Sequence, residues 1–237
     1  MEVTFAEKRV EALWRRARKA RRIADGAAEG WSTSNVGPLR VLRAFSALRL
    51  RTGFTLRAYQ FRAVGNGEGY VYAMPEGAVF PLPEQWPSDQ SASLAPPRPP
   101  QALEDIMDAV EGDGTPWSYF SASLFAREIS EFGAMWHGES WNTHRILATD
   151  AMSIIQRENK SSRSDCDPSV WTWEQPVPQQ WEPRLVQSSD SIKLVFHSFT
   201  GLGQQQIVQH TDEYQPRGYR FRIRRRVIAW GPLGYIY

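Results

Sequence analysis

The sequence predicts an α+β fold, with a mixed or mainly antiparallel sheet, helices packed on one face and a basic amphipathic helix at the N-terminus. Apolar residues recur at helical spacing near the N-terminus and in the middle of the chain, whereas residues 54–74 and 170–237 alternate as strands do. Because helical and strand-like segments do not alternate regularly, α+β is favoured over α/β. We expect the 237 residues to form a single globular domain over 1–237.

The N-terminal helix is the clearest element. Thr4 and Glu7 fit a capping box, and Gly26 is a plausible end. Its apolar stripe is Val10, Leu13, Trp14 and Ala17. The remaining faces carry Lys8, Arg9, Arg15, Arg16, Arg18, Lys19, Arg21 and Arg22.

A β-hairpin is predicted next, with strands at 54–62 and 70–74 joined by the glycine-rich loop 65–69, whose residues tolerate positive φ. Residues 75–100 are rich in proline, which lacks the amide donor that helices and central strands need, and we expect an extended surface segment. Its end, 96–100, resembles a polyproline ligand, but a plain linker is the favoured interpretation.

Two helices are predicted over residues 101–133. Leu103, Ile106, Met107 and Val110 have helical spacing, and Gly112-Asp113-Gly114 ends this first helix. Thr115-Pro116 is a good start for the second, 117–132, which is apolar nearly all round in its first half and therefore predicted to be buried. Residues 136–168 support no structural prediction.

The last third of the chain is predicted to be mainly strands, at 170–173, 192–197 and 220–224. Residues 206–214 fit either a strand or a short helix. A terminal hairpin is expected from 227–230, a turn at 231–234, and 235–237.

Composition narrows the class of protein. The single cysteine, Cys166, cannot form an internal disulfide, which suits a reducing compartment. No apolar run approaches the roughly 18–20 residues of a membrane span, and the N-terminus lacks a secretory signal. We therefore expect a soluble, cytoplasmic protein without a membrane partner.

Charge is unevenly distributed along the chain. Residues 1–64 hold fourteen Lys and Arg against five Asp and Glu, and residues 65–150 hold three against thirteen. Two interpretations stay open: the basic and acidic segments neutralise each other in the fold, or a basic surface faces an acidic partner. The sequence pI of about 8.8 is below the value of about 9 that is typical of nucleic-acid-binding domains.

Two basic clusters are the main functional signal. Residues 15–22 contain six cations, and residues 220–226 contain five, of which the alternate ones share a strand face. Guanidinium rows bind phosphates and carboxylates, so nucleic acid or an acidic protein is the expected partner, in an oligomer or multi-subunit complex if one forms. The predicted binding residues are Arg15, Arg16, Lys19, Arg22, Arg220, Arg222, Arg224 and Arg226.

A second hypothesis is catalytic. Imidazole and carboxylate pairs two residues apart could form a metal or acid–base site if they converge, although their spacing matches no zinc or iron signature. The candidates are His137, Glu139, His144, His210 and Asp212. We assign no metal and no cofactor from these spacings.

Other chemistries have weaker signals. There is no Gly-x-Ser-x-Gly elbow, and the acidic neighbours of Cys166 disfavour its thiolate. The glycines of 65–69 and 201–203 fit turns better than phosphate loops. Most of Trp136, Trp141, Trp171, Trp173 and Trp181 are expected to pack in the interior, an exposed subset marking an interface.

Taken together, these patterns favour a non-enzymatic binding or complex-subunit protein. The alternative function is a small metal-dependent or acid–base hydrolase or lyase, so enzymatic activity stays open.

Overall fold

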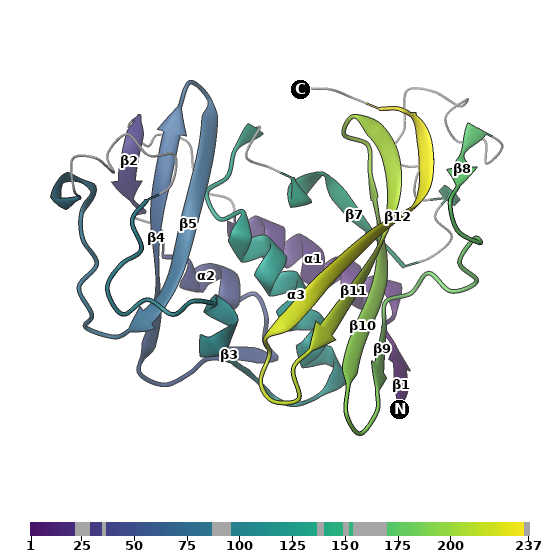
Figure 1. Ribbon diagram of the computed structural model, residues 1–237, viewed down its shortest axis with the longest axis horizontal. Helices are drawn as coiled ribbons and strands as arrows, with labels where there is room; N and C mark the ends of the chain where they lie inside the picture. Colours follow the sequence, from purple (N-terminus) through teal and green to yellow (C-terminus); the bar gives the residue numbers. More distant parts are fainter. Residues whose placement is uncertain are drawn as a thin grey trace. The chain divides into compact units, whose positions relative to one another are not determined.

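The computed structural model describes residues 1–21, 29–34, 37–86, 96–136, 140–148, 152–153 and 170–234. Their helices and exclusively antiparallel strand pairs (Figure 1) confirm the α+β class. The packing of the helices on one face stays a prediction.

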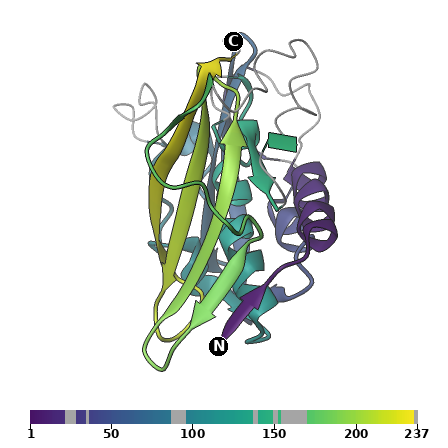
Figure 2. The ribbon, with the colours of Figure 1, turned by 90° about the vertical axis from the view of Figure 1, so that its right-hand side faces the viewer.

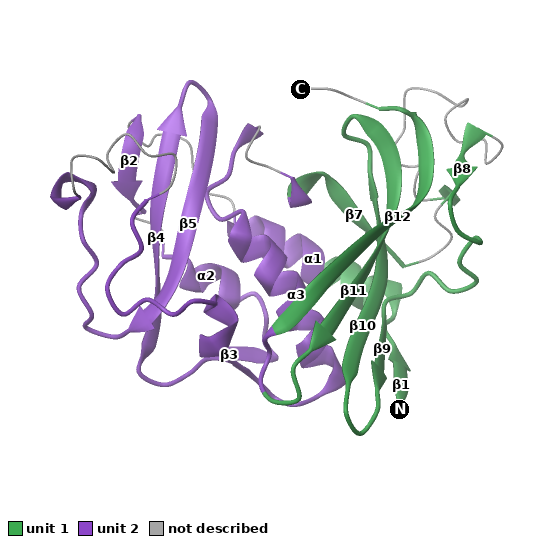
Figure 3. Cartoon of the chain, in the orientation of Figure 1, with its two compact units in different colours: residues 1–12, 142–217, 221–237 green, residues 13–141, 218–220 purple. Residues whose placement is uncertain are grey.

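The chain divides into two compact units (Figure 3), unit 1 comprising 1–12, 142–217 and 221–237, and unit 2 comprising 13–141 and 218–220. A single domain over 1–237 stays a prediction.

Unit 1 is built on a seven-stranded sheet of order β1-β9-β10-β11-β12-β8, with β7 pairing β10. Its three longest strands, β10 to β12, run side by side in Figure 2. The predicted strands at 192–197 and 220–224 are confirmed within β10 and β12, and 206–214 is a strand rather than a helix. The strands are β1 (Glu2–Thr4), β7 (His144–Leu147), β8 (Thr172–Trp173), β9 (Arg184–Gln187), β10 (Ile192–Thr200), β11 (Gln204–Tyr214) and β12 (Phe221–Leu233).

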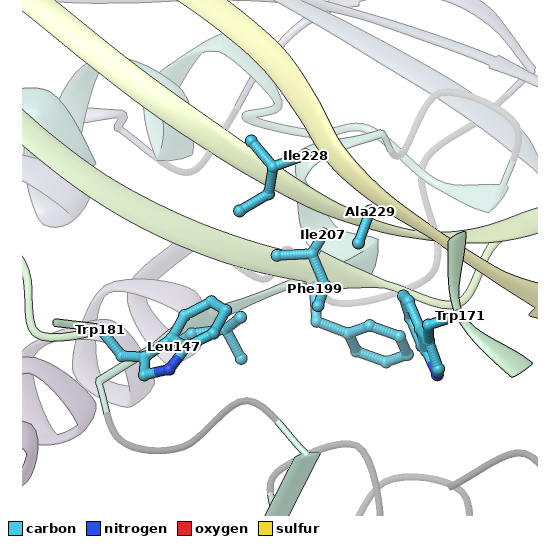
Figure 4. Close-up of a cluster of buried hydrophobic side chains, with 7 residues drawn as sticks. All are labelled: Leu147, Trp171, Trp181, Phe199, Ile207, Ile228 and Ala229. Carbon is cyan, nitrogen blue, oxygen red and sulfur yellow. The ribbon is translucent and has the colours of Figure 1, made fainter. Parts of the chain in front are cut away.

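One end of this sheet carries an apolar cluster (Figure 4). Trp171 and Trp181, from the segment that precedes β9, pack on side chains of four strands. The sheet contributes Leu147, Phe199, Ile207, Ile228 and Ala229. Burial of this much apolar surface is the main force that holds the segment on the sheet.

The turn predicted at 231–234 for the terminal hairpin is wrong. Residues 231–233 continue β12, and residues 235–237 lie outside the described part of the chain. A Cβ on Gly231 would stand 2.6 Å from the Trp171 ring, so glycine is required here by close packing and not by a turn.

The N-terminal helix α1 spans Glu7–Arg21, and the boundary between the two units falls inside it. Its predicted apolar stripe is confirmed, because Val10, Leu13, Trp14 and Ala17 are all buried. The capping box is wrong: Thr4 pairs with Arg184 in β1, and the Ala6 carbonyl accepts the first helical hydrogen bonds. The predicted end, Gly26, lies outside the described residues.

Unit 2 contains the predicted hairpin, formed by β4 (Phe54–Ala63) and β5 (Asn66–Pro75), with β2 (Gly30–Thr33) beside β4. Its turn is only Val64-Gly65, both at positive φ, which suits the twist of a tight hairpin. The loop predicted over 65–69 is therefore too long. Gly69 lies within β5, where a Cβ would stand 1.6 Å from the Phe132 carbonyl oxygen.

The proline-rich segment packs on this hairpin. The Phe80 ring stacks on Tyr59 at 4.3 Å between centroids, and the Tyr59 hydroxyl donates to the Pro81 carbonyl. Trp86, which follows the 3₁₀ turn η1 (Pro83–Gln85), is buried against Tyr59 and Trp31. In its described part, 75–86 and 96–100, the segment predicted to cross the surface thus also contributes Trp86 to the core, while residues 87–95 of the prediction lie outside the described residues.

The helix predicted at 103–111 is wrong. Only the 3₁₀ turn η2 (Ile106–Ala109) forms, followed by β6 (Val110–Gly112), which pairs with β3 (Leu48–Leu50). The Leu103 amide donates instead to the Ala73 carbonyl, so long-range strand bonds replace the helix. The second helix is confirmed as the buried α3 (Pro116–Ser130), and the short α2 spans Leu39–Leu42. No helix in the described ranges has both the length and the apolar character required to cross a membrane.

Candidate functional site

The basic cluster of α1 is partly turned inward. Arg21 is buried, and its Nη1 lies 2.6 Å from Oε2 of Glu131 while its Nε lies 3.4 Å from Oε2 of Glu128. Arg18 lies 3.9 Å from Glu128 and stacks over Trp14. These cations therefore stabilise the interior of unit 2 and are not available to a partner.

The carboxylates of this network come from α3 and its end. Glu128 is fully buried, which raises its pKa, while the charges of Arg21 and Arg18 act in the opposite direction. Trp141 donates its indole N–H to Glu128, and its backbone amide donates to Glu131. The ion pairs with Arg21 and Arg18 compensate the buried charge of Glu128, as buried ions require, although its Oε2 accepts no hydrogen bond within the described part of the chain.

The predicted binding residues of α1 that remain at the surface are Arg15, Arg16 and Lys19. Arg16 donates from Nε to the Ala44 carbonyl at 2.6 Å, which ties its side chain down. Arg22 lies outside the described residues. The helix therefore presents fewer mobile cations than its sequence suggests.

Arg220, at the start of the second cluster, is also engaged within unit 2. Its guanidinium lies 3.3 Å from Asp105 and 3.6 Å from Asp108. Together with Arg18 and Arg21, it shows that acidic residues of the middle segment neutralise part of both basic clusters. Internal neutralisation is therefore real, but incomplete.

The rest of the second cluster lies on β12 in unit 1. Strand alternation places Arg222, Arg224 and Arg226 on one face, and all three are exposed. Cross-strand register adds Lys193 of β10 and Arg184 of β9 to the same face. We call this set the basic face: Arg184, Lys193, Arg222, Arg224 and Arg226.

Two carboxylates lie on the basic face. Glu213 of β11 lies 3.4 Å from Lys193 and 2.9 Å from Arg224, and Glu2 lies 3.4 Å from Arg184. Arg222 and Arg226 have no ion pair with any residue that the structure describes. Counting only residues that the structure describes, five cations against two carboxylates leave the face positive.

A cavity of about 610 Å³ opens at the Arg226 end of the basic face. The row His197, Gln209 and Arg226, neighbours on β10, β11 and β12, forms part of its wall. Arg184 and the loop 175–180, with Gln175, Gln179 and Gln180, complete its polar lining, while Pro176, Pro178 and Ile228 are apolar. The cavity thus lies where the basic face meets the apolar cluster of unit 1.

His197 is the titratable group buried in this wall, with 5% of its surface exposed. Its Nε2 lies 3.2 Å from the Gln209 amide nitrogen, and its ring meets Trp181 edge-on at 5.2 Å. Burial, followed by the positive charge of Arg184, lowers its pKa from 6.5 to about 4. The imidazole is therefore neutral at pH 7, with one nitrogen able to donate and one able to accept.

Two of the catalytic candidates meet on the opposite face of the same sheet. Ser198 Oγ lies 2.8 Å from Nδ1 of His144 and 2.7 Å from Nε2 of His210, so it bridges the two imidazoles. Asp212 is buried two residues along β11 from His210. Ser198 and His210 are fully buried, whereas His144 is partly exposed, so solvent can reach this chain of hydrogen bonds at its His144 end.

His137 and Glu139 lie outside the described residues, so their position relative to His144 is not part of this structure. Among the residues that are described, no three His, Cys, Asp or Glu side chains come together as metal ligands would.

Sequence reasoning did not select Arg184, Lys193, His197 or Gln209, because only the register of β9 to β12 brings them together. The one sequence pattern that could have pointed to these residues is the alternation in β10, which places His197 on the same face as Lys193. Of the tryptophans, Trp141, Trp171 and Trp181 are buried as predicted, and Trp136 is exposed.

Comparisons with models of protein families, with curated proteins and with solved structures found no match to this chain.

Proposed function

We propose that the chain is a non-enzymatic binding protein, or a subunit of a complex, that engages an anionic macromolecule through the basic face of unit 1. The observation that supports this function is the exposed row of Arg222, Arg224 and Arg226 on β12. Because successive residues on one strand face are about 6.8 Å apart, each guanidinium reaches a separate anionic group.

Nucleic acid is the partner class that we favour. A guanidinium binds a phosphate through two parallel hydrogen bonds, and a regular row of three suits a regular phosphate backbone. On the basic face, the positions between the cations are Val195, Gln209, Thr211 and Glu213, with His197 recessed. None offers an exposed aromatic ring for stacking on bases, so backbone charge is the feature that is recognised.

Binding to a labelled DNA duplex tests this function, with polyglutamate as the competing acidic protein probe. We expect the double variant Arg222→Ala/Arg226→Ala to bind the duplex at least tenfold more weakly, since two phosphate contacts are lost. The matched control is Arg15→Ala/Lys19→Ala, which removes the same charge from the exposed side of α1 and should retain most of the affinity.

The outcomes discriminate between partner classes. Tighter binding of polyglutamate than of DNA, lost in the same β12 variant, would replace nucleic acid by an acidic protein as the partner. Equal losses in the two double variants would show that net charge and not the basic face drives binding, and would remove the proposal.

The alternative function, a metal-dependent or acid–base hydrolase or lyase, has one specific observation in its favour, the hydrogen-bonded pair His144 and His210. A hydroxyl held between two imidazoles can relay a proton. Metal analysis of the purified protein tests the metal-dependent form. A stoichiometric metal that is lost in His144→Ala would support it, and metal-free protein would leave only acid–base chemistry.

A further inference from the structure

The cavity at the end of the basic face carries an inference that does not depend on a macromolecular partner. We propose that it is a binding site for a small organic anion, a molecule with a phosphate or carboxylate group and a polar body. At about 610 Å³, it lies within the range of about 300–1,000 Å³ that is typical of small-molecule sites.

The charge of the lining selects an anion. Arg226 and Arg184 both border the cavity, and among the residues that the structure describes, none of those lining it is a carboxylate. The guanidinium of Arg184 also forms an ion pair with the carboxylate of Glu2 at 3.4 Å, whereas Arg226 has no ion pair with a described residue. Arg226 is therefore the expected primary contact of the anionic group, with Arg184 as the second.

His197 contributes a further polar group to the cavity wall. Its Nδ1 is buried and has no hydrogen-bond partner among the residues that the structure describes. Leaving a buried polar atom without a partner costs free energy, which a ligand contact would recover. The Gln209 amide nitrogen can only donate, so Nε2 of the neutral imidazole accepts and Nδ1 carries the hydrogen, which an acceptor oxygen of a ligand would satisfy.

The remaining polar wall fits a polar ligand body. Gln175, Gln179, Gln180 and Gln209 supply side-chain amides, each with donors and an acceptor. Pro176 and Pro178 restrict the backbone that carries three of them. Such a wall favours a ligand with several hydroxyl or amide groups over a purely apolar one.

Glucose 6-phosphate, gluconate and glucose are suitable probes, because they compare a phosphate, a carboxylate and an uncharged polar body. We expect either anion to shift the NMR signals of His197 and of the cavity glutamine amides, while glucose does not. The variants Arg226→Ala and Gln209→Leu should each weaken binding about tenfold. Arg222→Ala serves as the matched control, since it removes an equally exposed arginine outside the cavity and should change the affinity less than twofold.

The result separates this site from the proposed macromolecular function, because Gln209→Leu should not affect binding of the DNA duplex. Shifts that spread over the whole basic face, with equal effects of Arg222→Ala and Arg226→Ala, would overturn the cavity proposal. So would the absence of saturable binding of both anions at millimolar concentration.

Discussion

The two arginine clusters look alike in the sequence but differ in the structure. On α1, Arg18 and Arg21 turn inward to Glu128 and Glu131, and at the start of the second cluster Arg220 pairs with Asp105 and Asp108. On β12, Arg222 and Arg226 remain exposed and unmatched by described carboxylates. A dense run of cations therefore does not identify a binding surface until its neighbours are known.

Periodicity explains the difference. A helix distributes consecutive cations around its circumference, so some of those on α1 must meet the interior of unit 2. A strand directs alternate residues to one side, so the three even-numbered arginines of β12 share a single exposed face. A similar density of cations thus gives structural ion pairs on the helix and a continuous basic surface on the strand.

The largest expected effect tests the structural role of the α1 cluster. Arg21→Met leaves Glu128 and Glu131 buried without their main cation, which should lower the free energy of unfolding by about 3–5 kcal/mol. Chemical denaturation measures this loss. The exposed Lys19→Ala should change stability by less than about 0.5 kcal/mol, and similar losses for both variants would contradict the inward orientation of Arg21.

Adding Glu128→Gln to Arg21→Met sharpens this test. Because the neutral amide no longer needs a cation, the double variant should be more stable than the sum of the two single losses predicts. Strict additivity would mean that the two side chains do not interact.

The buried group beside the basic face is His197, and its lowered pKa predicts that the stability of the protein depends on pH. The pKa of His197 is lowered to about 4, so between about pH 6.5 and pH 4 the unfolded state binds a proton that the folded state does not. Stability should therefore fall as the pH falls through this window, by about 3 kcal/mol from this one residue. In His197→Gln the decline should be flatter by this amount, whereas parallel profiles would show that His197 is not buried as a neutral group.

Much of the fold could be predicted from local patterns. The stripe of α1, the hairpin strands, the buried α3 and the alternation in β10 and β12 all depend on residues close in sequence. The helix predicted from Leu103 to the glycines at 112–114 failed because its spacing competes with long-range backbone hydrogen bonds, those of Leu103 to Ala73 and of Arg51 to Ala109. Gly69 and Gly231 suggested turns but are required by contacts with Phe132 and Trp171, which no local pattern reveals.

The candidate site was less predictable. The alternation of Arg222, Arg224 and Arg226 was visible, and it places them correctly on one face. The cavity could not be predicted from the sequence. The loop 175–180 has the composition of an ordinary proline- and glutamine-rich connection, and only the register of the strands brings it together with His197 and Gln209. That register depends on packing of the whole sheet.

The smallest expected effect concerns Arg220, which adjoins the basic face in sequence but pairs within unit 2. Its ion pairs with Asp105 and Asp108 are solvent-exposed, so Arg220→Ala should cost only about 0–1 kcal/mol of stability. It should also leave affinity for a DNA duplex nearly unchanged. A loss of affinity as large as that of Arg222→Ala would place Arg220 in the binding surface and weaken the contrast between the two groups.

The salt dependence of duplex binding tests the central claim most directly, because its slope counts the phosphates that are neutralised. Relative to the unsubstituted protein, Arg222→Ala/Arg226→Ala should reduce the slope of log affinity against log salt by about 2, and Arg15→Ala/Lys19→Ala should leave it nearly unchanged. An unchanged slope for the β12 variant, or an equal reduction for the α1 variant, would contradict a binding role for the basic face.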